Sequence, residues 1–285
     1  MTAGGRVVVL GSLNVDHTAR VLQLPMRGQT VTARSYSRAL GGKGFNQAVT
    51  AARQGVDVVL VGCVGDDDGG TELLAALERE RISSAFVRRD ASMPTGRAHI
   101  TVDEKGDNQI VVVPGANGGA AFPSAALEGA TVLLAQLEVP LAVVTAAMAA
   151  ARAAGVTTIL NPAPARRLND ELLSNVDYLV PNETESEQLG EVSFGGIAIV
   201  TQGERGALVL RPGDGNRRVA AVPAIAVDTT AAGDAFCGCF AAALAEGRSL
   251  PESLRRAAAA GAFAVTIEGA LPSLPRAADV EALLT

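Results

Sequence analysis

The sequence predicts an α/β protein with three layers, α/β/α, in which a mostly parallel central sheet is covered by helices and a small β-sheet lid is added. Short β-branched, apolar runs alternate along the chain with alanine-rich stretches of helical length. Continuous apolar strands separated by helices are typical of a parallel sheet that is covered on both faces. Two other segments alternate polar and apolar residues, as half-exposed strands do, and they predict the second sheet.

The strands expected in the main sheet are short apolar runs, of which Val7-Val8-Val9-Leu10 is the first. β-Branched side chains favour extended backbone, and the alanine-rich stretches between these runs favour helix. The expected strands cover residues 6–10, 56–61, 131–134, 157–160, 178–180 and 197–201, and the expected helices cover residues 43–54, 70–80, 141–153, 235–246 and 251–267.

The lid is expected from residues 14–38 and 97–113. The run Ala98-His99-Ile100-Thr101-Val102 alternates in polarity, and both segments leave and rejoin the main domain near glycines, Gly41-Gly42 and Gly115. This is the arrangement expected of a flap hinged over a cleft. The main α/β domain is therefore expected to comprise residues 1–13, 39–96 and 114–285.

Composition excludes several classes of protein. The 285 residues are 48% apolar and 19% charged, which does not fit intrinsic disorder. A net charge of −6 offers no general attraction for nucleic acid or an anionic membrane surface. No apolar stretch reaches the roughly 18 residues that span a bilayer, and the N-terminus does not fit a signal peptide, so we expect a cytoplasmic protein. The three cysteines form no CxxC pair, and neither a disulfide framework nor a zinc site is expected.

The strongest local signal is a turn of small residues, Thr229-Thr230-Ala231-Ala232-Gly233-Asp234, that opens directly into an alanine-rich helix. The start of a helix exposes unpaired N–H groups and the positive end of the dipole, which suit a phosphate or a developing oxyanion. Asp234 is then either an acid that stabilises the dipole or a general base. In phosphoryl transfer to an alcohol, an Asp beside the acceptor hydroxyl takes its proton.

A second glycine-rich segment, Gly41-Gly42-Lys43-Gly44-Phe45-Asn46, also leads into a helix. Glycines permit close approach of a ligand, and Lys43 is one of only two lysines in the chain. The same pattern fits an ordinary helix start. The Walker A pattern GxxxxGK[ST] is absent from the sequence, which disfavours a P-loop kinase.

Polar residues follow the first expected strand in Gly11-Ser12-Leu13-Asn14-Val15-Asp16. Open α/β sheets bind ligands beyond the carboxyl ends of their strands. The Asn14 amide and the Asp16 carboxylate match the hydroxyl pair of a sugar, although an ordinary turn uses the same residue types.

Acidic residues follow two further strands. Asn182 and Glu185 fit a capped helix start, and alternatively Glu185 would orient a hydrated Mg²⁺ carried by nucleotide phosphates. Glu138 is either a surface acid or a sugar contact. His17 and His99 lie in no pattern that indicates a catalytic triad or a metal site.

Together these segments resemble the ribokinase branch of the PfkB carbohydrate kinase family over nearly the whole chain. Several coincident motifs are more specific than any one of them. In family order they are Gly11 to Asp16, Gly41 to Asn46, Gly115-Ala116-Asn117, Gln136-Leu137-Glu138, Asn161-Pro162-Ala163-Pro164-Ala165, Pro181-Asn182-Glu183-Thr184-Glu185 and Asp228 to Asp234.

The resemblance implies a transferase of carbohydrate metabolism that uses ATP to phosphorylate D-ribose at O5, with Mg²⁺, with a monovalent cation, usually K⁺, and as a homodimer joined through the lid sheets. It assigns the base to Asp234 and the anion hole to Ala231, Ala232 and Gly233. The sugar would be held by Asn14, Asp16, Gly42, Lys43, Asn46, Glu138 and Asp234, the nucleotide by Asn182, Glu185, Thr201, Gly203, Gly206 and Gly233, and the monovalent cation by Asp228, Thr230, Ala264, Ile267, Gly269 and Ser273.

Two alternatives stay open at this point. One is a kinase for another pentose or a nucleoside, such as deoxyribose or adenosine, because the same scaffold accepts altered sugar contacts. The other is a sugar-binding sensor without turnover. The segment 188–197 supports the sensor, because it is shorter than in ribokinases generally, as though one crossover helix were missing. The carboxylates Asp234 and Glu185 favour an enzyme.

Overall fold

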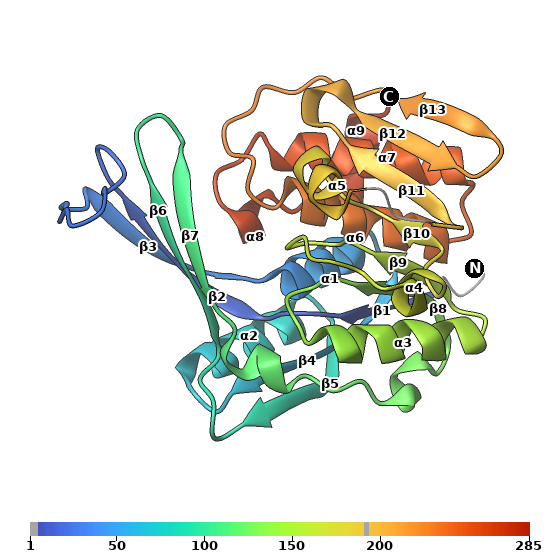
Figure 1. Cartoon of the computed structure of the whole chain (residues 1–285), viewed down its shortest axis with the longest axis horizontal. Coiled ribbons are helices and arrows are strands. Elements are labelled where there is room, and N and C mark those ends of the chain that lie inside the picture. Colours follow the sequence, from blue (N-terminus) through green and yellow to red (C-terminus); the bar gives the residue numbers. More distant parts are fainter. Residues whose placement is uncertain (1–4, 191–193) are drawn as a thin grey trace.

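The computed structural model describes residues 5–190 and 194–285, and its central element is a nine-stranded sheet (Figure 1). All neighbouring strands are parallel except β11, β12 and β13, which pair antiparallel at one edge. In spatial order the strands are β13 (Gly215–Val219), β12 (Ala207–Arg211), β11 (Ile197–Thr201), β10 (Tyr178–Leu179), β9 (Thr157–Leu160), β8 (Ala130–Ala135), β1 (Arg6–Leu10), β4 (Asp57–Gly65) and β5 (Ser83–Asp90).

Helices cover both faces of this sheet, which confirms the three-layer α/β/α prediction. Along β1, Val7 and Val9 pack in one apolar cluster and Val8 and Leu10 in another. The first cluster includes α1 (Lys43–Arg53), α2 (Asp68–Arg79), α6 (Ala232–Ala245), α7 (Leu250–Ala264) and α9 (Ala277–Ala282), and the second includes α3 (Leu141–Ala153) and α4 (Asp170–Leu173).

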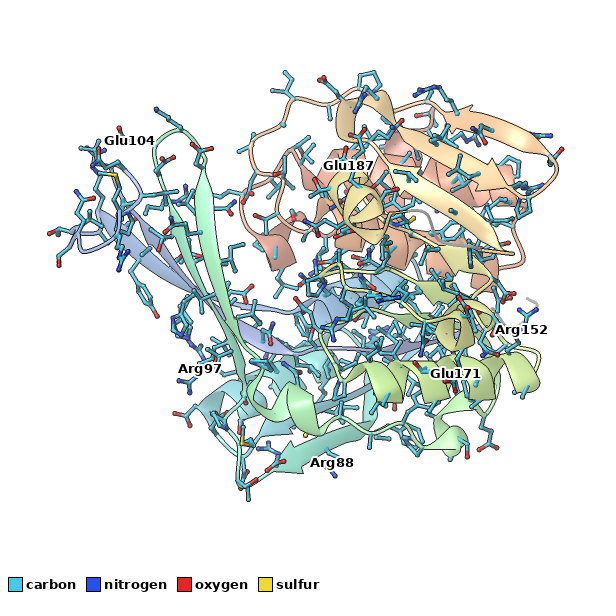
Figure 2. The ribbon with its side chains drawn as sticks, viewed as in Figure 1. Arg88, Arg97, Glu104, Arg152, Glu171 and Glu187 are labelled. Atoms are coloured by element: carbon cyan, nitrogen blue, oxygen red, sulfur yellow. The ribbon has the colours of Figure 1, made fainter. Side chains whose placement is uncertain are left out.

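The lid is a separate four-stranded sheet that projects from the main domain, as Figure 1 shows. Its central strands β2 and β6 are parallel, and each pairs antiparallel with an outer strand. Figure 2 shows Glu104 at the far end of this projection. In order, the strands are β3 (Ser35–Gly41), β2 (Asn14–Arg20), β6 (Gly96–Val102) and β7 (Asn108–Val113).

The main differences from the expected elements lie at the edges of the large sheet. β5 and the hairpin of β12 and β13 were not among the predicted strands. β5 reads SSAFVRRD and β13 reads GNRRV, and edge strands of this kind carry charged side chains instead of a continuous apolar run. The partners of β5 and β13 reveal them as strands, and their own composition does not. β12 reads ALVLR, an apolar run that does indicate a strand.

The short crossover before β11 still forms a parallel connection. Within it lies α5 (Glu183–Leu189), and residues 191–193 of the shortened segment 188–197 lie outside the described residues. β10 and β11 pair in parallel, and the Asn182–Thr201 bridge extends that pairing. The sheet is therefore continuous across this connection.

Candidate active site

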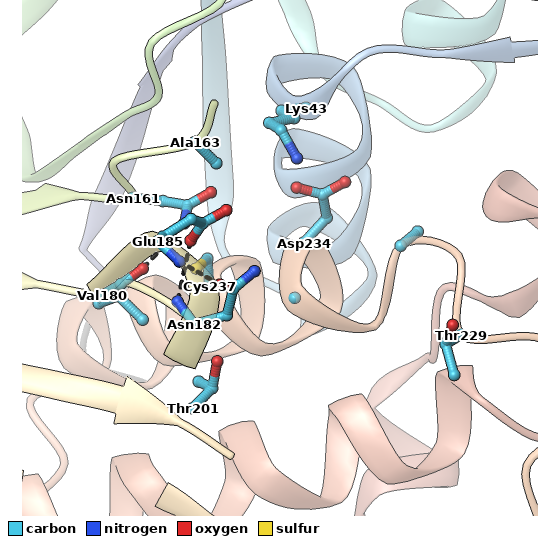
Figure 3. Close-up of a pocket in the computed structure, with 12 residues that line it drawn as sticks. Lys43, Asn161, Ala163, Val180, Asn182, Glu185, Thr201, Thr229, Asp234 and Cys237 are labelled. Carbon is cyan, nitrogen blue, oxygen red and sulfur yellow. Dashed lines mark hydrogen bonds between the residues drawn. The ribbon is translucent and has the colours of Figure 1, made fainter. Parts of the chain in front are cut away.

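A cavity of about 190 Å³ lies where several strands end and two helices begin (Figure 3). Residues that follow β9 and β10 meet there with the first turns of α1 and α6, as expected at the carboxyl edge of an open α/β sheet. The lining residues are Lys43, Asn161, Ala163, Val180, Asn182, Glu185, Thr201, Thr229, Ala231, Gly233, Asp234 and Cys237.

Asp234 lies in the first turn of α6 and is only 7% exposed. Its Oδ2 accepts a hydrogen bond from Asn46 Nδ2 at 3.0 Å, and its Oδ1 accepts one from Gln47 Nε2 at 2.9 Å. The two oxygens are therefore held by two amide side chains of α1. In Figure 3 the ammonium group of Lys43 points toward the same carboxylate.

The start of α6 has the backbone geometry of an anion site. Ala231 adopts a left-handed conformation (φ 61°, ψ 6°), and the 14-residue helix begins at the next residue. The first N–H groups of a helix have no intrahelical acceptor. Of the amides at this end, that of Ala232 makes a long hydrogen bond to the Thr229 carbonyl at 3.4 Å, with which a ligand would compete. Ala231 and Gly233 line the cavity, and Ala232 is the residue between them.

The carboxylates that the resemblance assigns to the sugar affect one another strongly. Burial raises the pKa of Asp16 to about 7, repulsion from Glu138 and Asp234 adds to this rise, and Lys43 opposes it. Burial works against the Lys43 ammonium, but Asp234 and Glu138 outweigh it and raise the pKa of Lys43. The site is thus a compact group of carboxylates with one cation among them.

Two glycines of the segment 41–46 make room for these side chains. A Cβ at Gly41 would lie 2.1 Å from Asp16 Oδ2. Gly42 has φ +93°, and a Cβ there would lie 2.9 Å from both the Asn14 amide nitrogen and the Ser12 carbonyl oxygen. Close approach of backbone and carboxylate therefore requires glycine at both positions.

The remaining sugar-side residues are held in fixed orientations. Asn14 is 3% exposed, and its Oδ1 accepts a hydrogen bond from Asn117 Nδ2 at 2.8 Å. This leaves the Asn14 amino group free to donate to a ligand. Glu138 Oε2 accepts hydrogen bonds from the Ser12 hydroxyl and, at 3.2 Å, from the Lys43 amide. Glu138 is thus tied to the same two segments rather than free on the surface.

On the other side of the cavity, Asn182 and Glu185 form the start of α5. The Asn182 side chain accepts from the Glu185 amide at 2.7 Å, and Glu185 Oε2 accepts from the Asn182 amide at 2.9 Å, which is a complete capping box. The hydrogen bonds of the described chain engage only this one oxygen of Glu185. Both residues also line the cavity, so the capping role and a ligand role are compatible.

The other residues that the resemblance assigns to the nucleotide lie along one edge. Thr201 ends β11 and lines the cavity. Gly203 and Gly206 lie in the turn to β12 and outside the lining. A Cβ at Gly206 would lie 2.0 Å from the Val219 carbonyl oxygen, so packing against the neighbouring backbone already requires glycine there.

Residues assigned to a monovalent cation gather behind the anion turn. Asp228 accepts from the Thr230 amide at 2.9 Å and from the Gly269 amide at 2.8 Å. Burial alone would raise the pKa of Asp228, but the hydrogen bonds from Thr230 and Gly269 hold it below its usual value. Ala264 ends α7, Ile267 follows it, and the Ser273 hydroxyl in α8 (Ala270–Ser273) donates to the Ala270 carbonyl at 2.8 Å.

Three buried amides at the site had no role assigned from the sequence. Gln47, Gln136 and Asn161 form a chain of hydrogen bonds that reaches Asp234. Gln136 and Asn161 stand inside the family motifs, so their positions were visible. Gln47 gave no signal of its own, because a glutamine in a helix is usually exposed and only its burial at 0% exposure marks it.

Comparison with known proteins supports this geometry. The model of the pfkB family of carbohydrate kinases matches residues 5–277. The chain is 39% identical to the ribokinase of Haemophilus influenzae over 94% of this chain and 95% of that protein. It is 34% identical to a deoxyribokinase of Salmonella typhi, over 94% and 95%. The structure of Arabidopsis thaliana ribokinase in complex with ribose and ATP matches with a TM-score of 0.90, 32% identity and 99% coverage of both chains.

Proposed function

Since this chain belongs to the pfkB family of carbohydrate kinases, we propose that it is an ATP-dependent ribose kinase in which Asp234 is the general base. It converts D-ribose and ATP to ribose 5-phosphate and ADP. The observation that carries the proposal is the buried Asp234 carboxylate at the start of α6, within 3.0 Å of Asn46, in a cavity that also contains Lys43.

The reaction is a direct transfer. Oxygen O5 of ribose attacks the γ-phosphorus of ATP, and the Asp234 carboxylate takes the O5 proton as this bond forms. The bond between the γ-phosphorus and the bridging oxygen breaks, and ADP leaves with that electron pair. The N–H groups of Ala231, Ala232 and Gly233 stabilise the negative charge on the transferred group. The base and the N–H groups that stabilise the transferred phosphoryl group therefore lie at the start of α6. The sugar lies between α1 and the lid.

The sugar is held by polar groups beside the cavity, of which Lys43 and Asp234 belong to its lining and the others do not. Asn14 and Asp16 contact its hydroxyl groups, Lys43 and Asn46 approach from α1, and Glu138 completes the set. The backbone at Gly42 approaches the sugar directly. The lid, residues 14–38 and 97–113, closes over the bound sugar and excludes water from the transfer.

The nucleotide lies against β11 and α5. Asn182, Thr201 and the turn with Gly203 and Gly206 flank it, and Gly233 contacts its phosphates. Glu185 fits a role toward Mg²⁺ because it lines the cavity and the hydrogen bonds of the described chain engage only one of its carboxylate oxygens. Carboxylates hold Mg²⁺ through water. When bound, Mg²⁺ would neutralise part of the negative charge of the phosphates.

A monovalent cation, usually K⁺ in the family, would be held by Asp228, Thr230, Ala264, Ile267, Gly269 and Ser273. The fit rests on adjacency: the Val265 carbonyl accepts the amide of Val227 at 2.7 Å, and the Gly269 amide reaches Asp228. When bound, such a cation would supply positive charge behind the turn that presents the anion-hole amides. A large, weakly hydrated cation suits this set, which is mainly of backbone carbonyls.

The assembly is a homodimer joined through the lids. Four consecutive apolar residues of the lid strand β7 are 41–63% exposed: Ile110, Val111, Val112 and Val113. Such a row on an edge strand favours cover by a second copy.

We place the enzyme in the cytoplasm, where ATP is available. Among the described residues no helix is long and apolar enough to cross a bilayer.

A second candidate substrate is deoxyribose, which the 34% identity to a deoxyribokinase favours. ADP release coupled to NADH oxidation, measured with ribose, deoxyribose, fructose and adenosine, separates the candidates. We expect the highest kcat/KM with ribose and a further increase with K⁺. A higher kcat/KM with deoxyribose or adenosine would show that this compound, and not ribose, is the substrate. If no compound caused ADP release, the result would favour a binding protein without turnover.

A further inference from the structure

We propose that Gln47 is a positioning residue, which holds the Asp234 carboxylate in the orientation that removes the O5 proton. The inference rests on the proposed function and adds to it a second layer of residues behind the base. Gln47 lies on α1 and is fully buried. It is not among the described residues that line the cavity, so it contacts the base without reaching the substrate.

Both N–H donors of the Gln47 amide and one of the two acceptor positions of its oxygen are used. Nε2 donates to Asp234 Oδ1 at 2.9 Å and to Asn161 Oδ1 at 3.1 Å. Oε1 accepts from Gln136 Nε2 at 2.6 Å. Gln136 follows β8 and Asn161 follows β9, so Gln47 is fixed from two strands as well as from its own helix.

This network permits only one orientation of the amide. Rotation by 180° would place Oε1 against the Asp234 carboxylate, a repulsive pair that no rotation of the carboxylate relieves. Gln136 alone does not fix the orientation, because its own Oε1 is buried without a hydrogen-bond partner among the described residues. Asn161 cannot relieve the repulsion by rotating, because its own amino group donates to the Val180 carbonyl at 2.8 Å. The donor that faces Asp234 Oδ1 is therefore set by the surrounding structure.

The two donors to Asp234 differ in how firmly they are held. Asn46 Nδ2 contacts Oδ2, and Asn46 Oδ1 is buried without a hydrogen-bond partner among the described residues, so one side-chain hydrogen bond holds this amide and it can move away from Oδ2 when a sugar hydroxyl takes its place. Gln47 cannot. We infer that Gln47 retains Oδ1 throughout and leaves Oδ2 to the substrate hydroxyl.

The test compares Gln47→Glu with Gln47→Met, using steady-state kinetics against pH. Gln47→Glu places a second carboxyl group beside Asp234, and two carboxyl groups at this distance share a proton. We expect the acidic limb of the kcat profile to move up by about one pH unit or more, with activity recovering at high pH. In Gln47→Met one hydrogen bond to a charged group is lost, so kcat should fall roughly 10- to 100-fold while KM for ribose changes less than about threefold.

The matched control is Thr158→Val. Thr158 is also fully buried, and its hydroxyl donates to the Asn175 carbonyl at 2.8 Å, but it lies at the other end of β9. It should lower the melting temperature without moving the acidic limb. Gln136→Met removes only the hydrogen bond that supports Gln47. It should move the acidic limb upward, as Gln47→Glu does, but by less, and it tests the inference if the Gln47 variants do not fold.

Three outcomes would overturn the inference. A Gln47→Glu or Gln136→Met enzyme with the wild-type pH profile would show that the amide does not act on the base, and so would a Gln47→Met enzyme with wild-type kcat. If wild-type protein releases ADP normally, these results leave the proposed function standing. Absence of turnover in the wild type with every sugar would overturn both.

Discussion

Asp16 is a buried carboxyl group whose protonation should control sugar binding. Its pKa of about 7 in the free protein means that it is largely protonated below pH 6. A protonated carboxyl group has lost the charge that accepts hydrogen bonds from the sugar hydroxyls. We therefore expect the affinity for ribose, measured by calorimetry between pH 5.5 and 8.5, to increase through about pH 7 and then level off.

The Asp16→Asn variant gives the matching stability prediction. Because the folded-state pKa lies above the usual value of 3.8, the folded protein binds this proton more tightly than the unfolded chain does. The free protein therefore loses stability as pH rises from about 4 to 7. Asp16→Asn should raise the melting temperature of the free protein at pH 8 by a few degrees and should have no such effect at pH 4. An equal effect at both values would contradict the raised pKa.

Ala231 is an L-residue in a conformation that favours glycine. A left-handed backbone costs such a residue about 1–2 kcal/mol of folding free energy. Glycine avoids this cost, but it loses more conformational freedom on folding than alanine does, which costs roughly 0.5–1 kcal/mol. Ala231→Gly should therefore raise the free energy of unfolding in urea by about 0.5 kcal/mol. Ala232→Gly, at the first helical position, should lower it, and the opposite order would exclude strain at Ala231.

At the scale of elements, α5 combines a helix cap with a proposed ligand role. Glu185→Gln keeps an oxygen that can accept from the Asn182 amide, so the capping box and the melting temperature should be retained. The charge toward Mg²⁺ is lost, and the Mg²⁺ concentration for half-maximal activity should increase about tenfold, which corresponds to roughly 1.4 kcal/mol.

The control for this variant is Glu187→Gln on the same helix. Glu187, labelled in Figure 2, is exposed and is not among the described residues that line the cavity. Loss of the Glu187 charge should leave the Mg²⁺ concentration for half-maximal activity unchanged. If both variants shift it equally, the effect is one of general surface charge and Glu185 has no specific role.

The elements that could be predicted are those whose own residues carry the signal. β1 and β9 match the predicted boundaries because they are continuous apolar runs, and α3 matches because its length and alanine content fit one helix. β5 and β13 could not be predicted, because edge strands are defined by their hydrogen-bonded partners. The same holds for the buried network, since no pattern in the sequence distinguishes Gln47 from a surface glutamine.

At the scale of the whole molecule, the lid is both the proposed cover of the site and the proposed dimer surface. The residues of this sheet come from two separate parts of the chain, and glycine hinges and alternating polarity indicated their location. Arg20 of the lid contacts Glu268 of the main domain, so the lid is anchored near the proposed cation site. Which strands pair in the lid follows from the three-dimensional structure alone.

The dimer prediction concerns Val111, which is 63% exposed on β7. Val111→Lys places a charge in the proposed contact between two lids, and light scattering after size-exclusion chromatography should show a change from dimer to monomer. Ile225→Lys, at a residue 85% exposed outside the lid, is the control and should leave the mass of a dimer. A monomeric wild type, or a dimeric Val111→Lys protein, would contradict this interface.

The most direct measurement is the turnover of Asp234→Asn with ribose and MgATP, together with its affinity for ribose. Asn46 has a free oxygen that can accept from the new amide, so the site should stay folded and bind ribose within about threefold of wild type. Removal of a general base lowers turnover by roughly 10²- to 10⁴-fold, and we predict a loss in this range. Turnover within tenfold of wild type, with ribose still bound, would show that the carboxylate at the start of α6 does not remove the proton.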